Sequence, residues 1–256
     1  MNYKRSKYFT TSSKKKIKYF FMKKNSQITI VFFHGFMSDM IGAKPTAIQK
    51  FCKKHKLNFL KFEYSGHGKS SGKFINGNIS KWSNEAKQLI RYKIKKNTKL
   101  IFIGSSMGSW IALKLFPVFK KRIKGFIGIA SAPEFLENLM WKKFSRKTKN
   151  TIINKKIYYL DYGGFTYPLT KQLIFNGRKN KVLNTKINVN IPIVLFHGTK
   201  DKVVPINVSK KILKIFKNAN KKLIKIKKGK HSLSTKSDLK KICSELKLIV
   251  KNITFD

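Results

Sequence analysis

The hydrophobic residues of this chain fall into short continuous runs, separated by longer stretches in which they recur at helical spacing. The clearest run is residues 28–33, Ile-Thr-Ile-Val-Phe-Phe, whose members are almost all apolar and are β-branched or aromatic. Such a run is typical of a strand that is covered on both faces. We predict further strands at residues 57–64, 101–103, 125–130, 193–196 and 223–226.

Helical periodicity between these runs predicts that helices join most of the strands. Pro45, a residue favoured in the first turn, marks the start of one helix. Thr235 and Asp238 have the spacing of a capping box in front of the last helix. Other helices are predicted around Trp82, from the turn after residue 103 to near Pro117, and over residues 205–216.

Strands that alternate with helices predict an α/β fold, with a mostly parallel sheet covered by helices on both faces. Residues 8–12 and 17–22 are predicted to be two edge strands.

Residues 133–190 interrupt the alternation of strands and helices. They begin with an amphipathic stretch at 134–141 and continue into an aromatic, glycine-containing segment between Tyr158 and Tyr167. An insertion of this length between sheet strands usually covers a site. We therefore predict one domain over residues 1–256, with residues 133–190 as a lid within it that lies over the site and supplies an apolar pocket.

Composition limits the class of protein. The chain has 256 residues, 41% of them hydrophobic, so it can bury a large core. None of its apolar runs reaches the ~20 residues of a membrane span, which predicts a soluble protein. Cys52 and Cys243 are too few for a disulfide framework or a metal site and favour a reducing compartment, so we expect a cytoplasmic protein. The first 38 residues contain no acid, which leaves a transit peptide, and hence the mitochondrial matrix, as the alternative to a basic first pair of strands.

The charge is unusual, because 58 Lys and Arg face only 10 Asp and Glu, giving a net charge of +48. One interpretation is a polyanionic partner, either a nucleic acid or an anionic membrane. Two observations oppose a specific nucleic-acid function. The excess is spread along the whole chain, and it is nearly all Lys, whereas base readout and bidentate phosphate binding favour Arg. Arg occurs only at positions 5, 91, 122, 146 and 178.

A Gly-x-Ser-x-Gly motif spans residues 104–108, with Ser106 at its centre. It follows a predicted strand and precedes a helical apolar pattern, which is the context in which this motif presents a nucleophile at a tight turn. Gly104 and Gly108 suit such a turn because neighbours of the serine must lack bulk. The alternative is a chance match in a loop rich in Gly and Ser.

A serine hydroxyl becomes a good nucleophile only when a base removes its proton and an acid orients that base. On a sheet of this type the partners follow the serine in the order acid, then histidine, each after a strand. Asp201 and His231 satisfy that order. Asp161 and Asp238 are the competing acids, but Asp161 lies in the insertion and Asp238 follows the histidine as a predicted cap.

The other histidines have structural interpretations. His34 and His197 lie in His-Gly turns that close strands, His67 lies in a turn, and His55 lies at a Lys-rich helix end. The oxyanion hole is expected to consist of two backbone N–H groups, those of Phe36 and Met107, on position alone.

These pieces resemble the α/β-hydrolase family along nearly the whole chain. The sequence is most similar to the branch that contains the mitochondrial acyl-glucuronide esterase and palmitoyl-protein thioesterase, with its bacterial relatives. Ser109 departs from the pattern, since such relatives commonly have Gly there. The matching motifs are His34-Gly35-Phe36-Met37-Ser38-Asp39-Met40, Tyr64-Ser65-Gly66-His67-Gly68-Lys69-Ser70, the motif around Ser106 with Trp110, Ser131-Ala132-Pro133-Glu134-Phe135, His197-Gly198 with Asp201 and Val204-Pro205, and His231-Ser232-Leu233-Ser234.

The resemblance implies hydrolysis of carboxylic esters or thioesters through an acyl-enzyme, with no metal or organic cofactor. Ser106 is the expected nucleophile, His231 the base and Asp201 the orienting acid. The substrate would be a small-molecule ester or acyl thioester, or an acylated protein. Within the lid, Trp141, Tyr162 and Phe165 are candidate pocket residues. The competing hypothesis is a non-catalytic basic binding protein on a hydrolase scaffold. The sequence does not indicate an oligomeric state.

Overall fold

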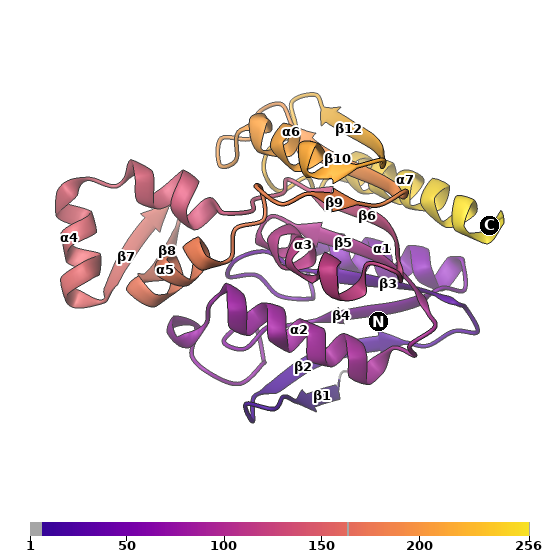
Figure 1. The fold of residues 1–256 in the computed structure, drawn as a ribbon, viewed down its shortest axis with the longest axis horizontal. Coiled ribbons are helices and arrows are strands. Elements are labelled where there is room, and N and C mark those ends of the chain that lie inside the picture. The colour runs from indigo at the N-terminus through magenta and orange to yellow at the C-terminus, as the bar shows by residue number, and fades with distance from the viewer. Residues whose placement is uncertain (1–6, 163, 256) are drawn as a thin grey trace.

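The computed structural model describes residues 7–162 and 164–255, and an eight-stranded sheet lies at its centre (Figure 1). At one edge, β2 pairs antiparallel with both β1 and β4. From β4 across to β12, all neighbouring strands are parallel. The strands, in spatial order, are β1 (Lys7–Thr10), β2 (Lys16–Met22), β4 (Asn58–Phe62), β3 (Ile28–Phe33), β5 (Lys99–Ser105), β6 (Ile123–Ile129), β10 (Pro192–Gly198) and β12 (Asn220–Ile226). The predicted strands, including both edge strands, are confirmed with shifts at their ends.

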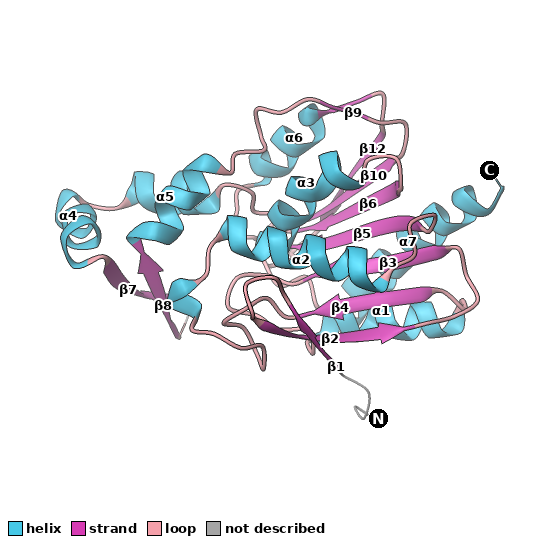
Figure 2. Cartoon of the chain, turned by 60° about the horizontal axis from the view of Figure 1, so that its bottom comes forward, coloured by secondary structure: helices cyan, strands magenta, loops and turns pink. Residues whose placement is uncertain are grey.

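Helices cover both faces of the sheet (Figures 1 and 2). The helices of one face are α1 (Ala43–Lys54) and α7 (Lys236–Phe255), and those of the other are α2 (Ile79–Lys93), α3 (Met107–Phe119) and α6 (Ile206–Ile215). Successive strand residues point to opposite faces, so Ile30 and Phe32 pack toward α1 and α7 while Val31 and Phe33 pack toward α2 and α3. Both sides of β3 are therefore buried, which explains its unbroken apolar run.

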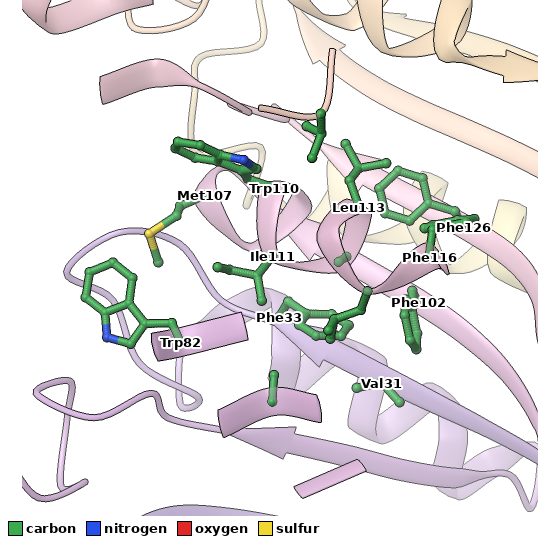
Figure 3. Close-up of a cluster of buried hydrophobic side chains, with 14 of the residues drawn as sticks. Val31, Phe33, Trp82, Phe102, Met107, Trp110, Ile111, Leu113, Phe116 and Phe126 are labelled. Atoms are coloured by element: carbon green, nitrogen blue, oxygen red, sulfur yellow. The ribbon is translucent and has the colours of Figure 1, made fainter. Parts of the chain in front are cut away.

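Helix α3 supplies much of the larger core (Figure 3). Its Phe116 ring packs edge-on against Phe126 of β6 at 5.7 Å and against Phe102 of β5 at 6.3 Å between ring centroids. The helix extends to Phe119, past its predicted end near Pro117. Pro117 removes one backbone donor, but Phe116 and Phe119 are buried against the sheet, and this packing holds the last turn.

The other helix starts are close to the predictions. Helix α1 begins at Ala43, two residues before Pro45, with Gly42 as its cap. The capping box in front of α7 is confirmed, because the Thr235 N–H donates to Asp238 Oδ2 at 3.1 Å and the Asp238 N–H donates to Thr235 Oγ1 at 3.2 Å. In the described part of the chain, no helix has the length and hydropathy that crossing a bilayer requires.

The segment after β6 leaves the sheet, projects beyond the carboxyl ends of the parallel strands and returns at β10 (Figures 1 and 2). Its two ends are tied together, because Glu134 Oε1 accepts hydrogen bonds from the N–H groups of Val182 and Leu183, each at 2.8 Å. It contains η2 (Leu136–Met140), η3 (Trp141–Lys143), α4 (Arg146–Lys155), the hairpin β7 (Ile157–Tyr162) and β8 (Phe165–Thr170), α5 (Lys171–Lys179) and β9 (Ile187–Asn188), which pairs with β11 (Phe216–Lys217); η1 (Phe74–Asn76) lies outside it.

The turn from β5 into α3 brings backbone segments into close contact. A Cβ atom at Gly104 would lie 2.5 Å from the Ser109 Cα, and one at Gly108 would lie 2.1 Å from the Phe33 carbonyl oxygen. Both distances are far inside van der Waals contact, and the obstructing atoms belong to backbone. Only glycine fits these two positions without displacing α3 or β3.

We expect Gly108→Ala to lower the free energy of unfolding by about 2 kcal/mol or more, because the added methyl group must push α3 away from β3. Gly42→Ala is the matched control, since a Cβ at Gly42 meets nothing within 4 Å. That change should cost less, about 1 kcal/mol, because alanine caps a helix less well than glycine but meets no obstructing atom here. Urea unfolding of the three proteins measures both effects, and equal stabilities would contradict the packing argument.

Candidate active site

Ser106 lies at the turn between β5 and α3, with φ 51° and ψ −118°. A positive φ is strained for a serine and persists only where the surroundings hold it. Here the Ser106 N–H donates to the Ile129 carbonyl at 2.9 Å, and the Ser106 carbonyl accepts from the N–H groups of Ser109 at 3.0 Å and Ala132 at 3.1 Å. The carboxyl end of β6 therefore fixes the turn that presents the Ser106 hydroxyl.

Ser109, which departs from the pattern that the family resemblance implies, is fully buried beneath this turn. Its hydroxyl donates to the Gly104 carbonyl and accepts from the Ser131 hydroxyl, both at 2.8 Å. The extra side chain thus links the elbow to the segment after β6.

The structure brings Ser106, His231 and Asp201 into one hydrogen-bonded chain. His231 Nε2 lies 3.1 Å from Ser106 Oγ, and His231 Nδ1 lies 2.8 Å from Asp201 Oδ2. With Nδ1–H donating to the carboxylate, Nε2 is left to accept the serine proton. Neither competing acid is in this chain: Asp161 accepts from Thr166 Oγ1 in the β7–β8 hairpin, and Asp238 caps α7.

Asp201 is held as a carboxylate by several donors. Its side chain is fully buried, and Oδ1 accepts from the N–H groups of Val203 and Val204, each at 2.9 Å. Burial acts to raise the pKa of Asp201, but the hydrogen bond from His231 and those from Val204 and Val203 outweigh it, so its pKa is lowered overall. Asp201 therefore stays ionised and can accept the hydrogen bond from His231 Nδ1.

The two expected oxyanion donors flank the serine. Met107 is the first residue of α3, so its N–H has no partner within the helix. Phe36 belongs to the loop after β3 and lines the cavity at Ser106. Within the described residues neither N–H donates a hydrogen bond, which leaves both available to an oxygen at the site.

The other histidines are held in structural roles, as predicted for His34 and His197. The His197 ring bonds to Ser209 Oγ and to the Val204 carbonyl, each at 2.8 Å, and His34 Nδ1 bonds to the Gly35 carbonyl at 2.8 Å. His67 is buried among the rings of Phe74, Trp82 and Tyr64, and burial lowers its pKa to about 4.

A cavity of about 560 Å³ opens at Ser106 and His231. That volume lies in the range of small-molecule sites. Loops from the sheet form part of its lining, and residues 133–190 contribute Lys143 and a set of apolar side chains. Those side chains are Phe135, Leu139, Met140, Phe144, Leu160 and Tyr167.

Two of the three predicted pocket residues lie outside the cavity. Trp141 packs against Arg178 and Phe175, and it does not line the cavity. Phe165 is 67% exposed near the end of the hairpin, also outside the cavity. The side chain of Tyr162 lies outside what the structure describes. Leu139 and Met140 line the cavity but were not predicted to do so. They belong to the amphipathic stretch at 134–141, and periodicity alone does not indicate which residues of such a stretch face a cavity.

Lys44 is a cation on the cavity wall that sequence reasoning also missed. Its Nζ donates to the Ser232 carbonyl at 2.5 Å and to Ser234 Oγ at 3.0 Å, which ties α1 to the loop that carries His231. Burial lowers the pKa of Lys44 to about 8, and the charge of Asp238 partly offsets that effect.

Comparison with known proteins identifies the family of this fold. Residues 24–163 match the family model described as serine aminopeptidase, S33, and residues 168–249 match the one described as phospholipase/carboxylesterase. The chain belongs to the α/β-hydrolases.

Among curated relatives of this α/β-hydrolase, the mitochondrial palmitoyl-protein thioesterase ABHD10 of Mus musculus is 28% identical over 217 residues, covering 82% of this chain and 71% of the relative. Among solved structures, a putative hydrolase from Agrobacterium vitis is 26% identical with a TM-score of 0.89, covering 96% of this chain and 98% of that chain. The structure of mouse α/β-hydrolase domain-containing protein 10 has a TM-score of 0.88 at 24% identity, covering 97% of this chain and 99% of that chain. This similarity shows that the two chains share a fold.

The buried histidine beside the site predicts a loss of stability in acid. His67 has a folded pKa of about 4 and an unfolded pKa near 6.5, so between these values the unfolded chain binds more protons. Stability must then fall as the pH drops from 7 to 4.5, by about 2 kcal/mol from His67 alone.

Urea unfolding of the parent and of His67→Phe at both pH values tests this. The free energy of unfolding should differ between pH 7 and pH 4.5 by about 2 kcal/mol less in His67→Phe than in the parent protein. His55→Phe is the matched comparison. Burial and the charges of Lys247 and Lys54 also lower the pKa of His55, but His55 is far less buried than His67, so its replacement should shrink the difference less. An unaltered pH dependence in His67→Phe would contradict the assignment.

Proposed function

We propose that this α/β-hydrolase cleaves carboxylic esters or thioesters through an acyl-enzyme intermediate. The hydrogen-bonded chain from buried Asp201 through His231 to Ser106 is the observation that carries the proposal. The strained turn under Ser106 and the cavity above it support the same conclusion. A serine at the elbow favours an acyl-enzyme, because the hydroxyl can form a new ester with the substrate acyl group.

Acylation begins when Ser106 Oγ attacks the substrate carbonyl carbon and its proton passes to His231 Nε2. Asp201 stabilises the imidazolium that forms and keeps Nδ1 protonated. The negative charge on the former carbonyl oxygen is stabilised by the N–H groups of Phe36 and Met107. Collapse of the tetrahedral intermediate breaks the bond to the leaving oxygen or sulfur, which takes the proton from Nε2.

Deacylation repeats these steps with water. His231 removes a proton from water, the hydroxide adds to the acyl carbonyl, and Ser106 leaves with its proton restored. Each step uses only groups of the chain and the substrate, so this mechanism requires no metal or organic cofactor.

The lid and the cavity suggest the kind of substrate. In this proposal residues 133–190 act as a lid, and their apolar side chains hold the acyl group while the leaving group faces the loops. The name of the mouse relative, a palmitoyl-protein thioesterase, supports a thioester of an acylated protein as a substrate. A small-molecule ester or acyl thioester is the alternative substrate in this proposal. The same relative is named as mitochondrial, which favours the matrix over the cytoplasm if this chain shares its location.

Ser106→Ala should abolish labelling by a fluorophosphonate probe and lower hydrolysis of p-nitrophenyl and thiophenyl esters by roughly four orders of magnitude. His231→Ala should be comparably severe and Asp201→Asn somewhat less so. Steady-state kinetics with circular dichroism of each variant separates lost chemistry from lost fold.

The matched controls are Ser244→Ala, an exposed serine on α7, and His55→Ala, at the end of α1. Both should keep parental rates. Near-normal turnover by Ser106→Ala would refute the proposal.

Salt dependence tests the competing hypothesis of a basic binding protein. Exposed lysines occur on β1, α1, α4, β12 and α7, and thus on all sides of the fold. Affinity for DNA should therefore be weak and fall steeply with salt as counterions are released. Hydrolysis of neutral esters should vary only a few-fold, since the Asp201–His231 pair acts at short range. Tight, sequence-selective binding at physiological salt would favour the competing hypothesis.

A further inference from the structure

The β7–β8 hairpin has two faces of different character. Its register pairs Leu160 with Tyr167 and Tyr159 with Pro168. Successive residues of a strand point to opposite faces, whereas directly paired residues share one. Leu160 and Tyr167 line the cavity, so their face is directed toward it. Phe165, two residues before Tyr167 on β8, shares that cavity-facing side, and Tyr159 lies on the opposite side.

Three aromatic rings form a continuous row along this side of the hairpin. Phe36, beside Ser106 in the cavity wall, stacks on Tyr167 with 6.0 Å between ring centroids and an interplanar angle of 12°. Tyr167 in turn contacts Phe165 at 6.5 Å. We call Phe36, Tyr167 and Phe165 the aromatic row. It begins at the site of chemistry and ends outside the cavity.

The outer end of the row is unusually exposed. Phe165 is 67% exposed, more than any other large hydrophobic side chain in the described residues. It extends the apolar surface of the cavity by two strand residues, about 7 Å, beyond Tyr167. A flexible apolar ligand that enters the cavity and is too long for it would cover this ring on its way out.

We propose that the aromatic row binds the distal part of a long unbranched acyl chain, so that Phe165 selects for chain length. This inference rests on the proposed function, because it assigns the acyl end of the substrate to the hairpin. A short acyl group ends within the cavity beside Phe36 and Tyr167. A long chain continues past Tyr167 and buries its last methylene groups against Phe165.

The other apolar side chains of the cavity support an acyl chain that runs from Ser106 toward the hairpin. Leu160 lies opposite Tyr167 across the hairpin pair, and Leu139, Met140 and Phe144 lie on the same lid. No charged side chain of the hairpin shares the face of Phe165, because Asp161 pairs with Thr166 on the other face. Apart from the Tyr167 hydroxyl, the three side chains of the row present only apolar surface to a ligand.

The test compares Phe165→Ser with Tyr159→Ser, a matched change of an exposed aromatic residue on the opposite face of the same hairpin, where Tyr159 is 58% exposed. The kcat/KM values for p-nitrophenyl laurate and butyrate are measured below the critical micelle concentration. Phe165→Ser should lower the laurate-to-butyrate ratio roughly tenfold, and Tyr159→Ser should leave it unchanged. Phe165→Leu, which keeps an apolar side chain, should restore most of the ratio.

A binding measurement separates this inference from the proposed function. Calorimetric titration of Ser106→Ala protein with laurate and butyrate, with and without Phe165→Ser, needs no turnover. Weaker laurate binding with Phe165→Ser supports the aromatic row even if no ester is hydrolysed. Equal laurate affinities with and without Phe165→Ser would overturn it. An equal loss in Ser106→Ala protein that carries Tyr159→Ser instead would also overturn it, because the effect would then not depend on the face of the hairpin.

Discussion

The backbone strain at Ser106 is the constraint around which this structure is arranged. A serine at φ 51° needs neighbours that hold it, and those neighbours come from three strands. Gly104 and Gly108 allow α3 to approach β3, while the carboxyl end of β6 bonds to both backbone groups of Ser106. The parallel sheet therefore does more than form a core. It brings separate loops to one edge, where the strained turn is held and its hydroxyl is presented to His231.

The few acidic residues show a second constraint. The chain has ten, of which Asp256 lies outside the described residues, and each of the other nine accepts a hydrogen bond or pairs with a cation. Glu134 joins the two ends of the lid, Glu85 accepts from the Ser65 N–H, and Asp201 supports His231. Carboxylates thus occur where a backbone N–H, a hydroxyl or a cation needs an acceptor, and the lysines cover the surface without matching acids.

Much of the fold could be predicted from the chain itself. Continuous apolar runs such as residues 28–33 indicate strands covered on both faces, and the order of Ser106, Asp201 and His231 along the strands allows the three to meet at one edge. Helix ends were harder to predict, because local preference competes with packing. Pro117 should end α3 on its own propensity, but the burial of Phe116 and Phe119 extends the helix past it.

The sequence by itself determined the alternation of strands and helices, the glycines of the elbow and the order of the proposed triad, since these depend on local spacing and residue type. It did not determine which lid side chains face the cavity. Trp141 packs on Arg178 instead, and Leu139, Met140 and Tyr167 take the wall. Tertiary structure decided this because residues 133–190 lie outside the eight-stranded sheet, whose regular alternation fixes the direction of each strand side chain. The direction of each side chain there depends on how the hairpin and short helices pack on the loops around Ser106.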